Sequence, residues 1–254
     1  MQRIHHQLIV LREHMTQPSW IHATVATIFI SFGIATQDLC DTTTMVMTNT
    51  DFGTLQLTNK ETSSKKWESS SFMDLYESLN CHDHAYDSNK PLFSADMWAV
   101  LKRKHASQAG MDLSLLQTDE NQDVNYYAGY SEGKGRGIYA ARDFLEGELV
   151  HDGSVGTAFW NDGMQWKKFV MSLPPPMPCD AMEWTWIQQV EDKGWLLCLT
   201  MGNASLMNHD DNFNTAPSHK RSLQLYAVRD IKMGEELTCD YGYFDTNWDL
   251  FGLA

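Results

Sequence analysis

The stretch AVRDIKMGEELTCDYGY, residues 227–243, says more about the fold than any other part of the sequence. Two short segments typical of β-strands flank the turn sequence Lys232-Met233-Gly234. Taken alone, the stretch predicts no more than a hairpin. Together with two segments that precede it in the chain, it predicts a fold and a function.

The first of these segments is Gly133-Lys134-Gly135-Arg136-Gly137, followed by IYAARD at residues 138–143. Glycines allow the backbone to come close to a ligand. The spacing differs from the G-x-G-x-x-G of dinucleotide sites, and Lys134 is out of frame for a phosphate-binding P-loop. A hairpin turn is the simpler interpretation of this segment alone.

The second segment is LMNHDDNFNT, residues 206–215, whose His, Asp and Asn residues suit either a metal site or a polar turn. A metal-dependent hydrolase would combine Cys81-His82-Asp83-His84 with His209-Asp210. That spacing fits no hydrolase pattern that we can justify. His82 and His84 lie in a polar segment, where solvated side chains are expected.

The order of the three segments resembles that of the SET-domain family of protein lysine methyltransferases. The resemblance covers residues 126–244, and the last segment is its most specific part. It implies a mainly β fold with a few helices, made of small curved β-sheets. In this family the C-terminal segment threads under a preceding loop in a knot-like arrangement, which few folds do.

The resemblance also assigns roles to individual residues. Tyr241 matches the catalytic tyrosine, and Tyr243 would help to line the lysine channel. The cofactor implied is S-adenosyl-L-methionine, and the positions implied to bind it are Lys134, Gly135, Arg136, Gly137, Asn208 and His209. His209 would contact the cofactor mainly through its backbone.

Several positions depart from the family pattern Asn-His-Ser-Cys-x-Pro-Asn. Asp210 and Asp211 replace Ser and Cys, and the tail at 245–254 has no cysteine. The zinc site of many members is therefore expected to be absent, with no other metal in its place. Trp248 and Phe251 are candidates for closing the channel instead. Cys239 stands where many members have an aromatic or branched residue.

The function implied is S-adenosyl-L-methionine-dependent protein lysine N-methyltransfer, by direct displacement onto a neutral amine in a tyrosine-lined channel. A dry channel would lower the pKa of the substrate lysine from its usual value near 10.4. The substrate would be a basic protein or peptide with a histone or non-histone lysine. A non-catalytic SET-like protein-binding module is the alternative.

Charge and cysteine content narrow the possibilities further. The formal net charge is −14, with 19 Lys and Arg against 33 Asp and Glu, which argues against direct nucleic-acid binding and favours basic partners. Five cysteines without a CxxC pair predict reduced, buried thiols rather than a disulfide framework. Lys167-Lys168 is expected to be a solvated pair.

The remaining chain divides into three parts. Residues 1–35 contain the apolar run WIHATVATIFISFGIA at 20–35, which suits a targeting peptide, a short membrane anchor or a buried helix. Without a targeting role, the nucleus or cytoplasm would be the location. Residues 36–125 read as an N-terminal extension, partly helical and partly disordered, and 245–254 form the tail.

Secondary structure is predicted most clearly in two places. Helices are expected near Phe72 and from Ala95 to His105, where Ser94 can cap the first turn. WTWIQQV and GWLLCLTM are expected to form a hairpin around Asp192-Lys193-Gly194. Few helices are expected after residue 110.

Overall fold

The computed structural model of the protein describes residues 67–87, 89–111, 122–219 and 222–254. The targeting or anchor segment predicted at 1–35 and the first part of the extension, 36–66, lie outside the described residues. Among the helices that are described, none is long and apolar enough to cross a membrane.

The N-terminal extension is helical where it is described. Its elements are η1 (Trp67–Ser69), α2 (Phe72–Ser78), α3 (Cys81–Tyr86), α4 (Ala95–Ala109) and α5 (Gln122–Asn125). Ser71 and Asp74 form a capping box at the start of α2, and the Ser94 side chain caps α4 as predicted. Gly110, with φ 63°, ends α4 in the left-handed conformation that glycine favours.

The larger sheet brings the three sequence segments together. Its strands are β1 (Tyr126–Ser131), β2 (Gly135–Ala140), β3 (Leu149–Asp152), β7 (Asn208–His209), β8 (Thr215–Pro217), β9 (Gln224–Ala227) and β10 (Glu236–Cys239). Strand β10 pairs antiparallel with β2 and parallel with both β7 and β8. The C-terminal strand therefore lies between strands that precede it in the chain, and the glycine segment, Asn208-His209 and the 227–243 stretch become neighbours.

The smaller sheet has the order β4-β6-β5, formed by β4 (Thr157–Trp160), β5 (Trp186–Val190) and β6 (Gly194–Thr200). The predicted hairpin is confirmed: β5 and β6 pair antiparallel, and Asp192 adopts φ 61° in the turn. Two helices, α6 (Gly163–Ser172) and α7 (Met177–Trp184), connect β4 to β5. In the described part of the chain after residue 110, helices are few, as expected, and the two longest lie in this connection.

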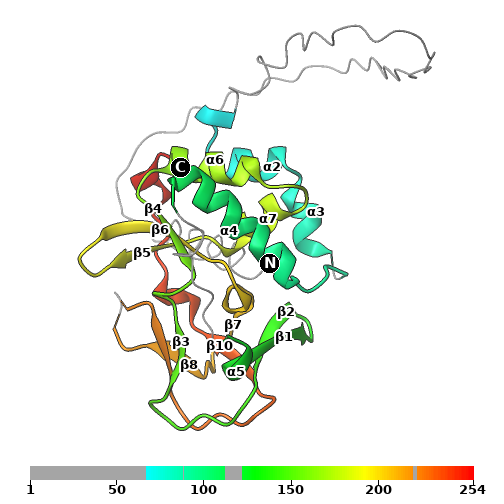
Figure 1. Ribbon diagram of the computed structural model, residues 1–254, viewed down its shortest axis with the longest axis vertical. Coiled ribbons are helices and arrows are strands. Elements are labelled where there is room, and N and C mark those ends of the chain that lie inside the picture. The colour runs from blue at the N-terminus through cyan, green and yellow to red at the C-terminus, as the bar shows by residue number, and fades with distance from the viewer. Residues whose placement is uncertain (1–66, 88, 112–121, 220–221) are drawn as a thin grey trace, which may run out of the picture.

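Helices α2, α3, α4, α6 and α7 gather at one end of the molecule, and the larger sheet lies at the other (Figure 1). One continuous core joins the two ends, with fully buried side chains from both, such as Tyr76 and Trp166 from the helices and Ile138 and Leu237 from the strands. The mainly β architecture with a few helices is that predicted from the sequence.

The C-terminal tail, which contains η5 (Trp248–Phe251), packs against the helices. The rings of Trp248 and Phe72 are 4.5 Å apart, and the Phe72 amide donates to the Leu253 carbonyl at 2.7 Å. Phe251 is buried, and its carbonyl oxygen would lie 2.1 Å from a Cβ added at Gly163. The prediction that Trp248 and Phe251 close the lysine channel is therefore wrong, because the helical extension offers them an apolar surface.

Two further predictions about charged and thiol side chains fail. Lys167 is buried and its ammonium binds the carbonyls of Glu68 and Ser70, whereas Lys168 is exposed as expected. Cys81 and Cys179 form a disulfide across a sequence separation of 98, which no local spacing reveals. Cys198 and Cys239 are buried and are not disulfide-bonded, as predicted, and Cys40 lies outside the described residues.

Candidate functional site

A cavity of about 400 Å³ lies where the larger sheet meets α3 and α7. Four of the positions that the sequence assigned to cofactor binding line it, together with the assigned catalytic residue: Lys134, Gly135, Arg136, Asn208 and Tyr241. Gly137 and His209 do not line it. Its volume is within the range of small-molecule sites.

Gly137 makes room for the network beside the cavity. A Cβ at this position would lie 2.8 Å from Glu236 Oε1 and 3.0 Å from Asn208 Nδ2. Both distances are too short for a side chain to fit without displacing these groups. Gly135 has a different reason to be glycine, since its φ of 81° is strained for other residues.

Asn208 joins the strands around the cavity through its side-chain amide. Its Nδ2 donates to the Arg136 carbonyl at 3.0 Å and to Glu236 Oε1 at 2.8 Å. The second carboxylate oxygen of Glu236 accepts from Ser131 Oγ at 2.7 Å. Both amide hydrogens are thus used within the protein, and they fix β7 to β2 and β10.

His209 orients Tyr241. The Tyr241 amide donates to His209 Nδ1 at 3.1 Å, so Nδ1 carries no proton in this bond, and the two rings are 5.3 Å apart. The carboxylates of Asp211 and Asp240 lie 3.3 Å from Nε2 and 3.8 Å from Nδ1. His209 thus contacts Tyr241 without lining the cavity itself.

Tyr241, in η4 (Tyr241–Tyr243), is buried, and its hydroxyl donates to the Met207 carbonyl at 2.7 Å. Met207 and Ser205, at the end of η3 (Asn203–Leu206), line this first cavity and also a second one. The tyrosine hydroxyl is therefore held close to the wall that separates two cavities.

The second cavity is narrow, about 50 Å³, and mostly apolar. Trp186, Met207, Cys239 and Phe244 contribute to its walls, and so does Tyr243, the predicted channel residue. A third, more open hollow shares Gln188, Tyr243 and Phe244 with it and adds Trp195 and Asp245. An apolar passage with an acidic, aromatic rim suits a long side chain that ends in a cation.

Asp210, which departs from the family pattern, has a partner that the sequence did not indicate. Its carboxylate accepts from Lys134 Nζ at 2.6 Å and from the Asn212 amide at 2.9 Å. The hydrogen bond from Lys134 is the main reason that the pKa of Asp210 is lowered. The pair connects the glycine segment to the residue after β7, whereas the Asp211 carboxylate is fully exposed.

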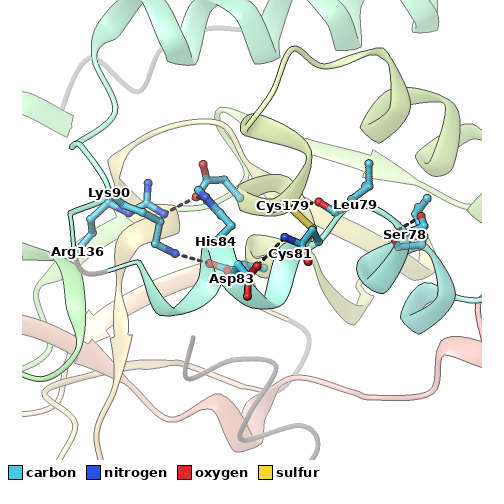
Figure 2. Close-up of a disulfide and its surroundings, with 12 residues drawn as sticks. Ser78, Leu79, Cys81, Asp83, His84, Lys90, Arg136 and Cys179 are labelled. Carbon is cyan, nitrogen blue, oxygen red and sulfur yellow. Dashed lines mark hydrogen bonds and ion pairs between the residues drawn. A yellow bond between two sulfur atoms is a disulfide. The ribbon is translucent and has the colours of Figure 1, made fainter. Parts of the chain in front are cut away.

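The Arg136 side chain is buried against α7. Its guanidinium pairs with Asp180 and lies 5.0 Å from the Trp184 ring. His84 Nε2 is 2.9 Å from the same carboxylate (Figure 2). Burial raises the pKa of Asp180, but the bonds from His84 and Arg136 outweigh it, so the pKa is lowered overall.

The expectation that His84 is solvated is thus wrong, because a buried carboxylate from a distant helix binds it, whereas His82 is exposed. Cys81 is likewise engaged, in the disulfide. Over the described ranges, no three His, Cys, Asp or Glu side chains are grouped to hold a metal ion. Cys81 and His84, two of the four residues that a hydrolase would draw from α3, therefore have other partners.

Comparisons with known proteins agree with the fold. The family model of the SET domain matches residues 135–242. A Chaetomium thermophilum Polycomb Repressive Complex 2 structure bound to S-adenosylmethionine has 21% identity and a TM-score of 0.37, covering 49% of this chain and 16% of that one. A candidate histone methyltransferase of Plasmodium falciparum has 18% identity and a TM-score of 0.29, covering 46% and 97%.

This chain therefore spans only a small part of the length of the Polycomb chains. A comparison with curated proteins gives no match. The family match falls on β2, β7 and β10, the strands that the glycine segment, Asn208-His209 and the 227–243 stretch form. The chain contains a SET domain, as the order of its three segments predicted.

Proposed function

We propose that this protein is an S-adenosyl-L-methionine-dependent protein lysine N-methyltransferase. One observation carries the proposal: the glycine segment, Asn208 and Tyr241 line one cavity, and its wall at Met207 borders a second, apolar cavity. This arrangement allows a methyl donor and a lysine to approach each other from opposite sides.

The first cavity fits a zwitterionic nucleoside derivative. Gly135 and Arg136 line it, and Trp184 offers an aromatic surface for a base. Lys90 adds a positive charge to the lining and Glu183 a negative charge, which suits a ligand with an ammonium and a carboxylate. When bound, S-adenosyl-L-methionine would supply a methyl group activated by a sulfonium centre.

The second cavity would receive the substrate lysine. Its apolar walls disfavour the ammonium form, so the amine loses its proton to water more readily than in solution. The rings of Trp186, Tyr243 and Phe244 would surround the stem and stabilise the methylated cation. These residues would thus hold a neutral amine in position to accept the methyl group, with the thioether of the methyl donor as leaving group and no covalent enzyme intermediate.

Tyr241 would align the amine. Its hydroxyl donates its hydrogen to the Met207 carbonyl, and a phenol oxygen can also act as a hydrogen-bond acceptor. An acceptor held in this position can bind an N–H group of the amine and so direct the nitrogen lone pair toward the methyl donor. Positioning of this kind accounts for the rate without a strong base.

The substrate would be a basic segment of a protein, with histone and non-histone lysines both in this class. The net charge of −14 attracts such a segment at long range. Asp240 lines the second cavity and Asp245 the hollow next to it, so acidic groups stand where basic residues beside the target lysine would lie. The alternative, a non-catalytic SET-like binding module, would keep this surface but not the transfer.

Calorimetric titration of the full chain with S-adenosyl-L-methionine is the first test. We expect micromolar affinity, followed by transfer of a labelled methyl group to basic proteins. Binding of basic proteins without any transfer would favour the binding module. A folded chain that does not bind S-adenosyl-L-methionine would contradict the proposed function.

The Lys134–Asp210 pair is expected to support cofactor binding modestly. Both side chains are partly exposed, so the pair is worth about 0.2–1 kcal/mol, and Lys134→Ala or Asp210→Ala should weaken S-adenosyl-L-methionine affinity by about twofold to fivefold. The double variant should lose no more than the larger single loss, because the two residues act through one contact.

The matched control is the exposed Lys232–Asp143 pair, 2.9 Å apart and absent from the cavity lining. Lys232→Ala should leave the dissociation constant unchanged. If the double variant lost as much S-adenosyl-L-methionine affinity as the two single variants together, the two residues would act separately and not through their contact.

A further inference from the structure

Helix α3, which precedes the SET match, forms part of the wall of the cofactor cavity. Ala85 and Tyr86 from α3 and the following Lys90 line the cavity, opposite Glu183 and Trp184 from α7. The site is therefore shared between the SET domain and the N-terminal extension. Whatever holds α3 against α7 also holds this wall in place.

The disulfide between Cys81 and Cys179 joins the two helices next to the cavity (Figure 2). Cys81 lies four residues before Ala85, and Cys179 lies four before Glu183. Residues four apart share a face of an α-helix. The covalent bond is thus one helical turn from the cavity-lining residues on both helices.

Two non-covalent contacts also connect α3 and the residues that follow it to α7. His84 binds Asp180 at 2.9 Å, and Lys90 Nζ binds Glu183 Oε2 at 3.2 Å. The Asp180 carboxylate also forms an ion pair with the Arg136 guanidinium. Because the Arg136 carbonyl accepts from Asn208, a shift of α7 would be passed to the strand segment that lines the cavity.

Tertiary contacts determine the position of helix α3. It contains six residues and begins at Asn80 without a side-chain cap hydrogen bond, and helices this short are not stable by themselves in water. On one side α3 packs against α2, where the rings of His82 and Tyr76 lie 5.0 Å apart. Toward α7, loss of the covalent bond would leave the two polar contacts.

We propose that the Cys81–Cys179 disulfide controls the affinity of the cofactor site, which makes the site sensitive to redox conditions. This inference rests on the proposed function. A dithiol reductant would break the S–S bond, delivering two electrons and two protons to form two thiols, while the dithiol becomes a disulfide. Helix α3 would then separate from α7, and S-adenosyl-L-methionine would bind more weakly.

The coupling acts in both directions. If reduction weakens the affinity about tenfold, saturation with S-adenosyl-L-methionine must make the bond about tenfold harder to reduce. A tenfold change corresponds to about 30 mV in the reduction potential of a two-electron couple. Both cysteines are buried, so the reductant needs an opening of α3, which the bound cofactor would oppose.

The test uses the full chain, with the disulfide verified by mass spectrometry of unreduced peptides. Calorimetry with S-adenosyl-L-methionine should give a dissociation constant about tenfold higher after dithiothreitol treatment. The double variant Cys81→Ser/Cys179→Ser should show the weaker affinity and no response to dithiothreitol. That control separates this disulfide from the thiols Cys198 and Cys239.

Equal affinity in the oxidised and the reduced folded chain would overturn this inference and leave the proposed function standing. If the oxidised, folded chain did not bind S-adenosyl-L-methionine, both this inference and the proposed function would be contradicted. A reduced chain that loses its far-ultraviolet circular dichroism would show that the bond secures the whole fold, which also overturns local control.

A second variant tests the wall without touching the bond. Tyr86→Ala in the oxidised chain should weaken S-adenosyl-L-methionine binding severalfold, because this exposed side chain lines the cavity. Tyr127→Ala is its control, since Tyr127 is also exposed but does not line the cavity. An equal effect of both substitutions would exclude α3 from the site.

Discussion

Replacement of Asn208 with alanine is expected to weaken S-adenosyl-L-methionine binding about a hundredfold. The substitution removes two buried hydrogen bonds, to the Arg136 carbonyl and to the Glu236 carboxylate, and each is worth about 1–3 kcal/mol. These bonds fix β7 to β2 and β10 beside the cavity. Without them, only the pairing of β10 with both β2 and β7 sets the distance between β7 and the backbone around Gly135.

Asn214→Ala is a matched control for this prediction. Asn214 is also a buried asparagine bound to β10, with Nδ2 donating to the Glu236 carbonyl and Oδ1 accepting from the Thr238 amide. It does not line the cavity. Both variants should lose stability in thermal unfolding, but only Asn208→Ala should lose affinity in calorimetry. Wild-type affinity in Asn208→Ala would remove Asn208 from the site.

The central part of the fold could be predicted from sequence because its signals are local. The turn at Lys232-Met233-Gly234 and the flanking strand patterns identify β9 and β10, and Ser94 marks the start of α4. The order of the three segments then indicated the SET-domain fold, and the structure adds the pairing of β10 with β2 and β7. No local pattern predicts that pairing by itself.

The rest depends on partners that are distant in sequence. Cys81 and Cys179 are separated by 98 positions, and nothing near either cysteine indicates the other. His84 and Arg136 have polar surroundings in the sequence, yet both bind the buried Asp180. Their burial follows from the docking of α3 on α7, which hydrophobic periodicity cannot specify.

Asp210 shows the same limit within the site. In the sequence, Asp210 is only a departure from the family pattern, and no contact for its side chain is indicated. In the structure it binds Lys134, which lies 76 positions earlier in the chain. In this chain a carboxylate and an ammonium group thus connect the Asn-His loop to the glycine segment.

Tyr241→Phe is expected to slow methyl transfer about a hundredfold while S-adenosyl-L-methionine affinity stays within about threefold. The ring remains in place, because His209 and Phe244 pack against it at 5.3 and 5.7 Å between ring centroids. What is lost is the hydroxyl oxygen beside Met207, and with it the acceptor that orients the amine. Single-turnover rates and calorimetry on the same preparation separate the two effects.

Tyr139→Phe supplies the comparison, since the Tyr139 hydroxyl also donates to a backbone carbonyl, that of Tyr130, at 2.7 Å. Tyr139 does not line either cavity, so its loss should leave the transfer rate unchanged. A hydroxyl that acts only in folding would make the two variants alike. A slow Tyr241→Phe beside a normal Tyr139→Phe would place the Tyr241 oxygen at the reacting amine, and a full-rate Tyr241→Phe would exclude it from the reaction.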